Sequence, residues 1–224
     1  MPKVVFWDWT GTLADESALD KAVCRTMEEM CAKNNGISTE EAVQRFNRIL
    51  KNLEGTWGWH DYTEHGRKLG CDWKEALQIN LEKLIILPHA EEILDYSKKQ
   101  GYLNCLVTNA VRDVISMRLK HSGLEKYFDL ILASDDVKSI KSEGKHFALG
   151  IERLKADVGS SYSIGDNPVQ DLIPAKKLGI KTVFCAYWKG KTHYHSEHIS
   201  KQHSHDAKAD YVIQNLMELK GILI

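Results

Sequence analysis

Short apolar runs alternate with amphipathic segments along most of this 224-residue chain. Five of the runs combine β-branched, aromatic and leucine residues over six to eight positions, which predicts buried strands. They cover residues 3–8, 102–109, 128–134, 161–166 and 181–187. The helical patterns between them end in basic residues and Gly, and these patterns cover residues 89–101, 110–123 and 168–179. Strands and helices that alternate at this spacing predict a parallel sheet with helices on both faces.

One long segment interrupts this alternation. Residues 15–85 contain no convincing strand, and their apolar residues recur at helical spacing. Ser38 and Glu41 are placed as a capping box at the start of one of the helices. The expected helices cover residues 17–36, 38–55 and 72–84.

The place of this helical insert suggests its role. It follows the first strand directly, so it lies over the carboxyl edge of the sheet, where folds of this kind bind ligands. We therefore expect an α/β protein in two parts. Residues 1–14 and 86–224 form a Rossmann-like core with a parallel sheet, and residues 15–85 form a small all-helical cap.

Composition and charge argue against several classes of function. A hydrophobic fraction of 43% with a net charge of −1 gives no reason to expect nucleic acid or an anionic membrane as partner. No apolar run approaches the roughly 20 residues of a membrane span, and the N-terminus lacks the basic and apolar parts of a leader. The five Cys form no C-x-x-C pair, as expected for reduced thiols. We expect a cytoplasmic protein, either a monomer or a homodimer.

Polar residues follow the predicted strands where each strand ends. "DWTGT" (8–12) comes after the first strand, and "VTNA" (107–110) comes after the second. Lys141 precedes a later helix, and "IGDNPVQD" (164–171) follows the fourth strand. Because the carboxyl ends of parallel strands meet at one edge of a sheet, these segments are expected to gather at one site.

The order of these four segments, with a helical insert after the first, resembles the haloacid dehalogenase superfamily. Its Mg-dependent phosphatases carry D-x-D-x-T, then a Ser or Thr, then a Lys, then G-D-x-x-x-x-D. The resemblance covers essentially the whole chain. Singly, each residue has a commoner structural explanation as a turn residue, a helix cap or a solvated lysine. Together they imply a hydrolase of a small phosphorylated metabolite, similar to phosphoglycolate phosphatases.

The resemblance also implies a magnesium site. Asp8 would be the nucleophile and would carry the phosphoryl group as an aspartyl-phosphate. Mg²⁺ would be held by the carboxylates of Asp8 and Asp166 and by the backbone carbonyl of Thr10, hard oxygen ligands of the kind that this ion prefers. Asp171 would be a ligand through water or would orient the others.

Further residues would bind the phosphoryl group in this interpretation. Lys141 would hold the negative charges of nucleophile and phosphate in register. Thr108 and Asn109 would donate hydrogen bonds to phosphoryl oxygens. Backbone N–H groups from Trp9 to Gly11 would form a small anion-binding nest.

Thr10 departs from the family pattern, which has a second Asp there as general acid and base. A hydroxyl does not ionise near neutral pH and cannot replace it. Three interpretations stay open: a phosphatase that favours good leaving groups or borrows an acid from the cap, a low-activity phospho-ligand-binding pseudo-phosphatase, and a C–P hydrolase. The last resembles phosphonoacetaldehyde hydrolase, whose motif is similar to D-W-A-G-T, and it would need a cap lysine such as Lys51. A metal-free 2-haloacid dehalogenase is disfavoured because Asp166 and Asp171 are both kept.

The cap carries a segment that could reach the site. Residues 55–70 are rich in Gly, Trp and His and show no regular periodicity. Trp57, Trp59 and His60 could shape a substrate pocket, and His60 or His65 could replace the missing acid. Packing within the cap is the simpler interpretation of the same residues.

A second His-rich stretch follows the last predicted strand. Residues 193–205 contain five of the ten His of the chain. H-x-H spacing suits Zn²⁺ or Ni²⁺ when a scaffold places the ligands. A flexible loop with adventitious metal affinity is the simpler expectation.

Overall fold

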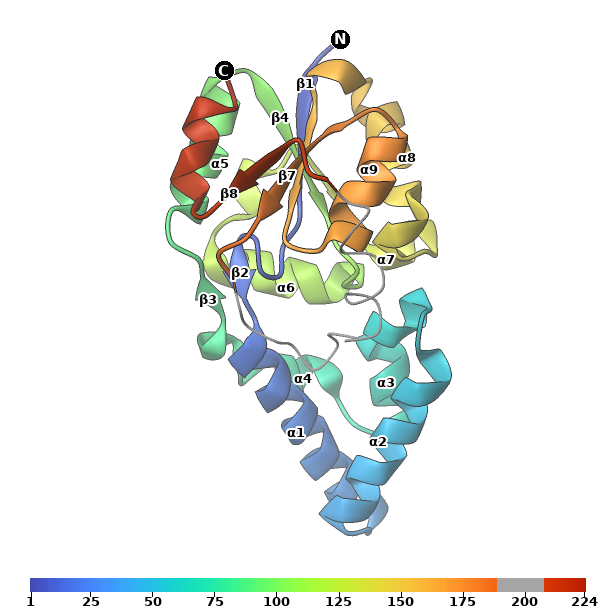
Figure 1. Cartoon of the computed structure of the whole chain (residues 1–224). Helices are drawn as coiled ribbons and strands as arrows, with labels where there is room; N and C mark the ends of the chain where they lie inside the picture. Colours follow the sequence, from blue (N-terminus) through green and yellow to red (C-terminus); the bar gives the residue numbers. More distant parts are fainter. Residues whose placement is uncertain (189–207) are drawn as a thin grey trace.

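A six-stranded parallel sheet forms the centre of the molecule (Figure 1). The computed structural model describes residues 1–188 and 208–224. Its strand order is β5-β4-β1-β6-β7-β8, and each neighbouring pair is parallel. The strands are β1 (Lys3–Trp7), β4 (Tyr102–Val107), β5 (Leu130–Leu132), β6 (Tyr162–Gly165), β7 (Lys181–Cys185) and β8 (Tyr211–Ile213). The predicted parallel sheet is confirmed, and β8 adds a strand that the sequence did not predict.

Helices cover both faces of the sheet. They are α5 (Ala90–Lys99), α6 (Arg112–Ser122), α7 (Ser134–Val137), α8 (Lys145–Leu154) and α9 (Ile173–Lys177). β1 shows why helices are needed on both faces of the sheet. Its side chains alternate between two apolar clusters, and all of them from Val4 to Trp7 are fully buried. Phe6 packs edge-on against Phe147 of α8 on one face. On the other face Trp7 donates a hydrogen bond to Asn104 at 2.9 Å.

Four helices lie between β2 (Ala14–Asp15) and β3 (Ile85–Ile86), which pair antiparallel at the boundary with the core. They are α1 (Ser17–Asn35), α2 (Thr39–Leu53), α3 (Tyr62–Leu69) and α4 (Trp73–Gln78). In Figure 1 they form the lower part of the molecule, beyond the ends of the sheet strands. We call residues 15–85 the cap, as in the division proposed from the sequence.

The predicted helices of the cap differ from the observed ones in two places. Asp61 caps α3 by accepting hydrogen bonds from the N–H groups of Thr63 and Glu64 in the first turn of the helix. α3 escaped prediction because its buried stripe consists of Tyr62, His65, Gly66 and Leu69, of which only one is an aliphatic residue. The helix predicted over residues 72–84 ends at Gln78 and gives way to a 3₁₀ turn, Leu81–Lys83.

Other local predictions hold or need small changes. Ser38 accepts a hydrogen bond from the Glu41 N–H at 3.1 Å, which is one of the two hydrogen bonds of the predicted capping box. The helix predicted over residues 168–179 begins as a π-helical turn, Pro168–Leu172, and continues as α9. In the described part of the chain no helix combines the length and the apolar character that crossing a membrane requires.

Cap and core share one apolar interior. A single cluster of buried side chains runs from Trp7 in β1 through Leu13 and Leu19 to Phe46 and Leu77 in the cap helices. Each Å² of apolar surface that this cluster removes from water stabilises the folded chain by roughly 25 cal/mol. The packing therefore holds the cap against the carboxyl edge of the sheet.

Candidate active site

The polar segments singled out in the sequence meet around one cavity of about 130 Å³. Asp8 follows β1 directly, Thr108 follows β4, Asp166 follows β6, and Lys141 lies in a short turn before α8. The core residues that line the cavity include Asp8, Thr10, Thr108, Asn109, Lys141, Asp166 and Asp171. The cavity is smaller than the roughly 300–1,000 Å³ that drug-sized ligands fill, so it suits a small substrate.

Asp8 is buried and held at both carboxylate oxygens. Its Oδ1 accepts a hydrogen bond from the ammonium group of Lys141. Its Oδ2 accepts one from the hydroxyl of Thr12 at 3.0 Å. Thr12 is a site residue that the sequence analysis did not assign, although it matches the final Thr of the D-x-D-x-T pattern.

Three carboxylates crowd together at the edge of the sheet. Asp8, Asp166 and Asp171 each place an oxygen within 4.8 Å of the others. Burial, together with the charges of Asp8 and Asp171, raises the pKa of Asp166 well above its usual value. A bound cation would relieve this repulsion, and a set of hard carboxylate oxygens is what Mg²⁺ prefers. The residues present therefore fit the predicted ion.

Lys141 lies between two of these acids. Its Nζ donates to Asp171 Oδ1 at 2.6 Å as well as to Asp8. Burial alone would lower the pKa of Lys141, but the charges of Asp171 and Asp8 raise it overall, so the side chain stays protonated.

Asp171 is engaged on both oxygens. Oδ1 pairs with Lys141, and Oδ2 accepts a hydrogen bond from the Asn167 N–H at 3.0 Å. Burial raises the pKa of Asp171 to about 7, against the opposing effect of Lys141. Asp171 was expected either to bind the metal ion through water or to orient the other site residues. Because both of its oxygens are already used, this arrangement favours the orienting role.

The family pattern has a second Asp at the position of Thr10. In this chain the carboxylate of Glu16, from the start of the cap, lies beside Thr10 instead. Thr10 Oγ1 donates to Glu16 Oε2 at 2.6 Å, and the Trp9 indole donates to Glu16 Oε1 at 2.7 Å. Glu16 is only 2% exposed, and it lines the cavity. Burial raises the pKa of Glu16, although Arg118 opposes this shift. Nothing in the sequence pattern around Glu16 pointed to this contact.

Arg118 of α6 binds the start of the cap to the core. Its guanidinium, in a side chain that is 5% exposed, pairs with Glu16 at 3.0 Å and with Asp20 at 2.9 Å. The hydroxyl of Tyr62, from α3, donates to Asp20 at 3.1 Å. We call Glu16, Asp20, Tyr62 and Arg118 the junction network. It joins three elements that are far apart in the sequence.

In the loop after β1, one of the three N–H groups expected to form an anion nest from Trp9 to Gly11 is already used. The Gly11 N–H donates to the Ala14 carbonyl at 2.8 Å and is therefore used within the loop. The Trp9 side chain is fully buried, and neither residue lines the cavity. Gly11 has a different requirement, because with φ at 83° a Cβ there would lie 2.4 Å from Asp166 Oδ2.

Thr108 and Asn109 differ in what they can offer a ligand. The Thr108 oxygen accepts a hydrogen bond from the Ala110 N–H at 3.1 Å, and the hydroxyl can still donate. The Asn109 side chain accepts from the Lys141 N–H at 2.9 Å and donates to Gln170. Asn109 therefore ties the loop of Lys141 to Gln170, a cavity-lining residue that the sequence analysis missed.

The cap candidates separate into two groups. Trp59 and His60 line the cavity, whereas Trp57 and His65 do not. His65 is fully buried inside the cap, with Nε2 3.1 Å from the Gly58 carbonyl oxygen. Burial and nearby positive charges lower the pKa of His60 to about 3, so this residue is neutral near pH 7 and is a poor substitute for the missing acid.

The remaining sequence candidates are Lys51 and the His-rich stretch. Lys51 is exposed on α2 and is not among the lining residues. The His-rich stretch 193–205 lies outside the described residues.

The contact between Thr10 and Glu16 makes a testable prediction about stability. We expect Thr10→Asp to lower the free energy of unfolding by about 1–3 kcal/mol, because two buried carboxylates in contact cannot both ionise. For a chain of this size that corresponds to roughly 2–4 °C in Tm per kcal/mol. Thermal unfolding followed by circular dichroism measures the change.

Matched variants sharpen this test. Adding Glu16→Gln to Thr10→Asp should recover most of the loss, because an amide can donate to the introduced carboxylate. Thr63→Asp, on an exposed position of α3, should change stability by no more than about 0.5 kcal/mol. Equal stability of Thr10→Asp and the unaltered chain would show that the two side chains do not share this contact.

One family model and several known proteins resemble this chain. The model is described as haloacid dehalogenase-like hydrolase and matches residues 5–185. Pyrophosphatase PpaX of Oceanobacillus iheyensis is 22% identical over 221 residues, which cover 99% of this chain and 96% of that protein. Pyrophosphatase PpaX of Bacillus velezensis is 36% identical over 96 residues, 43% of this chain and 44% of the relative. The chain thus matches about half the length of several of these relatives.

The fold has a close match among solved structures. A crystal structure of a HAD phosphatase from Thermococcus onnurineus superimposes with a TM-score of 0.81 at 29% identity. The match covers 99% of this chain and 97% of the other. It therefore includes both the sheet and the cap helices.

Proposed function

We propose that this chain, which belongs to the haloacid dehalogenase-like hydrolases, hydrolyses a small phosphorylated metabolite through a covalent phosphoryl group on Asp8. The relatives named as phosphatases and pyrophosphatases support hydrolysis of a phosphate bond. The observation that carries the proposal is the placement of Asp8. Its carboxylate lines a cavity, is bound by Lys141 and Thr12, and lies among the other acids of the family pattern.

The proposed reaction has two steps. The Asp8 carboxylate attacks phosphorus, the bond from phosphorus to the leaving oxygen breaks, and an aspartyl-phosphate forms. Water then attacks this phosphorus and releases phosphate, which regenerates the carboxylate. Lys141 offsets the charge of Asp8 while it approaches an anionic substrate, and the Thr108 hydroxyl can donate to a phosphoryl oxygen.

We propose that Asp8, Asp166 and the Thr10 backbone carbonyl hold Mg²⁺, with Asp171 orienting the site through Lys141. When bound, the ion would supply positive charge that stabilises the phosphoryl oxygens. The helices of residues 15–85 would act as a cap that keeps bulk water from the cavity.

Thr10 shapes which substrates should react well. The hydroxyl that stands in place of the second Asp is bound to Glu16 and cannot itself protonate a poor leaving group. General acid catalysis is typically worth about 10² to 10⁴ in rate. We therefore propose that aryl and acyl phosphates, whose leaving groups need no proton, react faster than alkyl phosphates.

The C–P hydrolase alternative requires an unpaired lysine at the cavity, and the described lining residues do not supply one. Cleavage of phosphonoacetaldehyde through a Schiff base needs a lysine near the substrate carbonyl. Lys51 does not line the cavity, and Lys141 is bound between two carboxylates. A low-activity binding protein is disfavoured because the acids and the lysine of the family pattern lie together.

A screen that identifies the products tests this proposal. We expect phosphate release from p-nitrophenyl phosphate and acetyl phosphate in the presence of Mg²⁺, and a rate at least about 10²-fold lower after treatment with EDTA. Magnesium restored in excess should return the activity. Titration with Mn²⁺, followed by electron paramagnetic resonance, would report binding independently of turnover.

The same screen separates the alternatives. Phosphate released together with acetaldehyde from phosphonoacetaldehyde would identify the C–P hydrolase, and halide released from a haloacid would identify a dehalogenase. No turnover of any substrate, with unchanged ligand binding in Asp8→Asn, would identify a binding protein.

A further inference from the structure

We infer that the cap side of the cavity selects phosphate esters whose leaving group is an uncharged, hydroxyl-bearing alcohol over those whose leaving group carries a carboxylate or a second phosphate. The inference rests on the proposed function, and it concerns the part of the cavity away from Asp8. It differs from the phosphoglycolate-type substrate that the sequence resemblance implies.

Charge on this side of the cavity is the first argument. Apart from Asp8, Lys141, Asp166 and Asp171, the charged lining residues of the described chain are Glu16, Asp20, Glu54 and Arg118, and Glu16 lies beside Thr10. Burial raises the pKa of Glu16 and of Asp20, so the formal charge is −2 when all three carboxylates are ionised and −1 when Glu16 and Asp20 share one proton. An anionic leaving group placed here would meet like charge at short range, which is costly away from bulk water.

Arg118 is not available to offset that charge. It already pairs with Glu16 at 3.0 Å and with Asp20 at 2.9 Å inside the junction network. Lys141 is the other cation among the described lining residues, and it is bound between Asp8 and Asp171. A carboxylate or second phosphate would have to break one of these buried pairs to gain a cation, and a broken buried pair is strongly unfavourable.

The neutral groups on this side suit a hydroxylated alcohol instead. Trp59 lines the cavity, and its indole N–H is buried without an acceptor among the described residues. A buried donor of this kind gains a hydrogen bond from an alcohol oxygen without the need for a cation, whereas a carboxylate could accept the same hydrogen bond only close to the other carboxylates of this side. His60 is neutral near pH 7 and adds a further hydrogen-bonding group.

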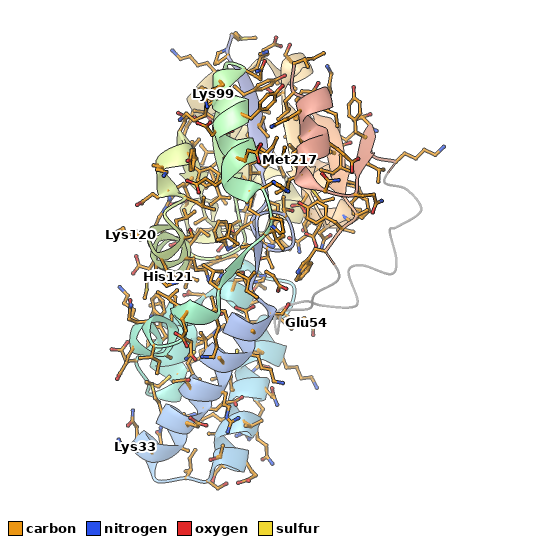
Figure 2. The ribbon with its side chains drawn as sticks, turned by 90° about the vertical axis from the view of Figure 1, so that its left-hand side faces the viewer. Lys33, Glu54, Lys99, Lys120, His121 and Met217 are labelled. Carbon is orange, nitrogen blue, oxygen red and sulfur yellow. The ribbon has the colours of Figure 1, made fainter. Side chains whose placement is uncertain are left out.

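Glu54 allows the charge of this side to be changed without disturbing the junction network. It follows the last residue of α2 and is exposed at the rim of the cavity. Figure 2 shows Glu54 at the end of the cap nearest the core, whereas Lys33 lies at the opposite end. Substitution at Glu54 therefore leaves the pairs of Arg118 in place.

Esters of equal size but different charge give the direct test. The set is 2-hydroxyethyl phosphate and 2-phosphoglycolate, with ethane-1,2-diyl bisphosphate as a second ester whose leaving group is anionic. We expect kcat/KM for 2-hydroxyethyl phosphate to exceed that for each of the two esters with an anionic leaving group by about tenfold or more. For any ester that is not turned over, the Ki against p-nitrophenyl phosphate ranks binding in the same way.

Charge reversal at the rim tests the electrostatic cause. Glu54→Lys should lower the preference for 2-hydroxyethyl phosphate over 2-phosphoglycolate about three- to tenfold, and 1 M salt should remove most of this change because the screening length falls to about 3 Å. Glu40→Lys is the matched control. It lies fourteen positions earlier on the same helix, roughly 20 Å away, and should leave the preference unchanged.

Each outcome decides between the two proposals. Equal or better use of 2-phosphoglycolate or ethane-1,2-diyl bisphosphate, with phosphate released from p-nitrophenyl phosphate, overturns the selectivity and leaves the proposed function intact. No phosphate from any substrate overturns both. An effect of Glu54→Lys that persists in 1 M salt, or that Glu40→Lys reproduces, contradicts the electrostatic explanation.

Discussion

Asp8→Asn is expected to lower the rate of phosphate release by about 10³-fold or more, because the amide cannot form the covalent phosphoryl intermediate. The fold should be kept. The substitution removes one charge from a cluster of three acids, which offsets part of the lost hydrogen bond with Lys141. Rates with p-nitrophenyl phosphate, together with mass spectrometry of acid-quenched protein, measure both the turnover and the covalent phosphate.

Asp113→Asn is the control for this variant. Asp113 is exposed and pairs with Lys74 at 2.7 Å on the surface, so its substitution should leave the rate and the covalent intermediate unchanged. An Asp8→Asn protein that still accumulates phosphate on a side chain would place the nucleophile elsewhere. One that still releases phosphate at the original rate would contradict the whole proposed mechanism.

Arg118→Met is expected to give the largest loss of stability, about 3–5 kcal/mol, because it leaves Glu16 and Asp20 buried without their cation. For a chain of this size this loss lowers Tm by roughly 10 °C. Methionine keeps much of the length and apolar stem of arginine, so the change isolates the charge. Urea unfolding, followed by fluorescence and by circular dichroism, measures the free energy.

Two comparisons show whether charge is the cause. Arg25→Met removes an exposed pair with Glu29, so it should cost no more than about 0.5 kcal/mol. Adding Glu16→Gln and Asp20→Asn to Arg118→Met should recover a large part of the loss, since no buried charge then remains unpaired. A loss below about 1 kcal/mol in Arg118→Met would mean that the junction network does not stabilise the cap against the core.

Much of the core was predictable from local sequence. β1 and its neighbours are short runs of residues that can be buried on both faces, and this property is visible without knowledge of the fold. The segments of Asp8, Thr108, Lys141 and Asp166 follow or precede predicted elements, so a parallel sheet brings them to one edge. Helix caps such as Ser38 depend on contacts three residues apart and were equally accessible.

Contacts between distant segments were not predictable in this way. Glu16 and Arg118 are 102 positions apart, and neither carries a sequence signal for the other. The choice of His60 over His65 as a cavity residue depends on how α3 packs, because His65 turns into the cap interior. The Gly11 N–H was expected to bind an anion, but it donates to the Ala14 carbonyl. This hydrogen bond depends on the conformation of the loop and is not visible in the sequence.

The sequence by itself determined the fold class, the order of the strands along the chain and the set of acids and lysine around Asp8, because periodicity and motif spacing are local properties. Tertiary structure decided which residue binds the Thr10 hydroxyl. The acceptor is the carboxylate of Glu16, which directly precedes the first helix of the cap. It also decided the charge of the cap side of the cavity, because the guanidinium of Arg118 is already paired there. Folding brings these polar groups from distant segments within hydrogen-bonding distance and buries them together. No single segment of the sequence contains this information.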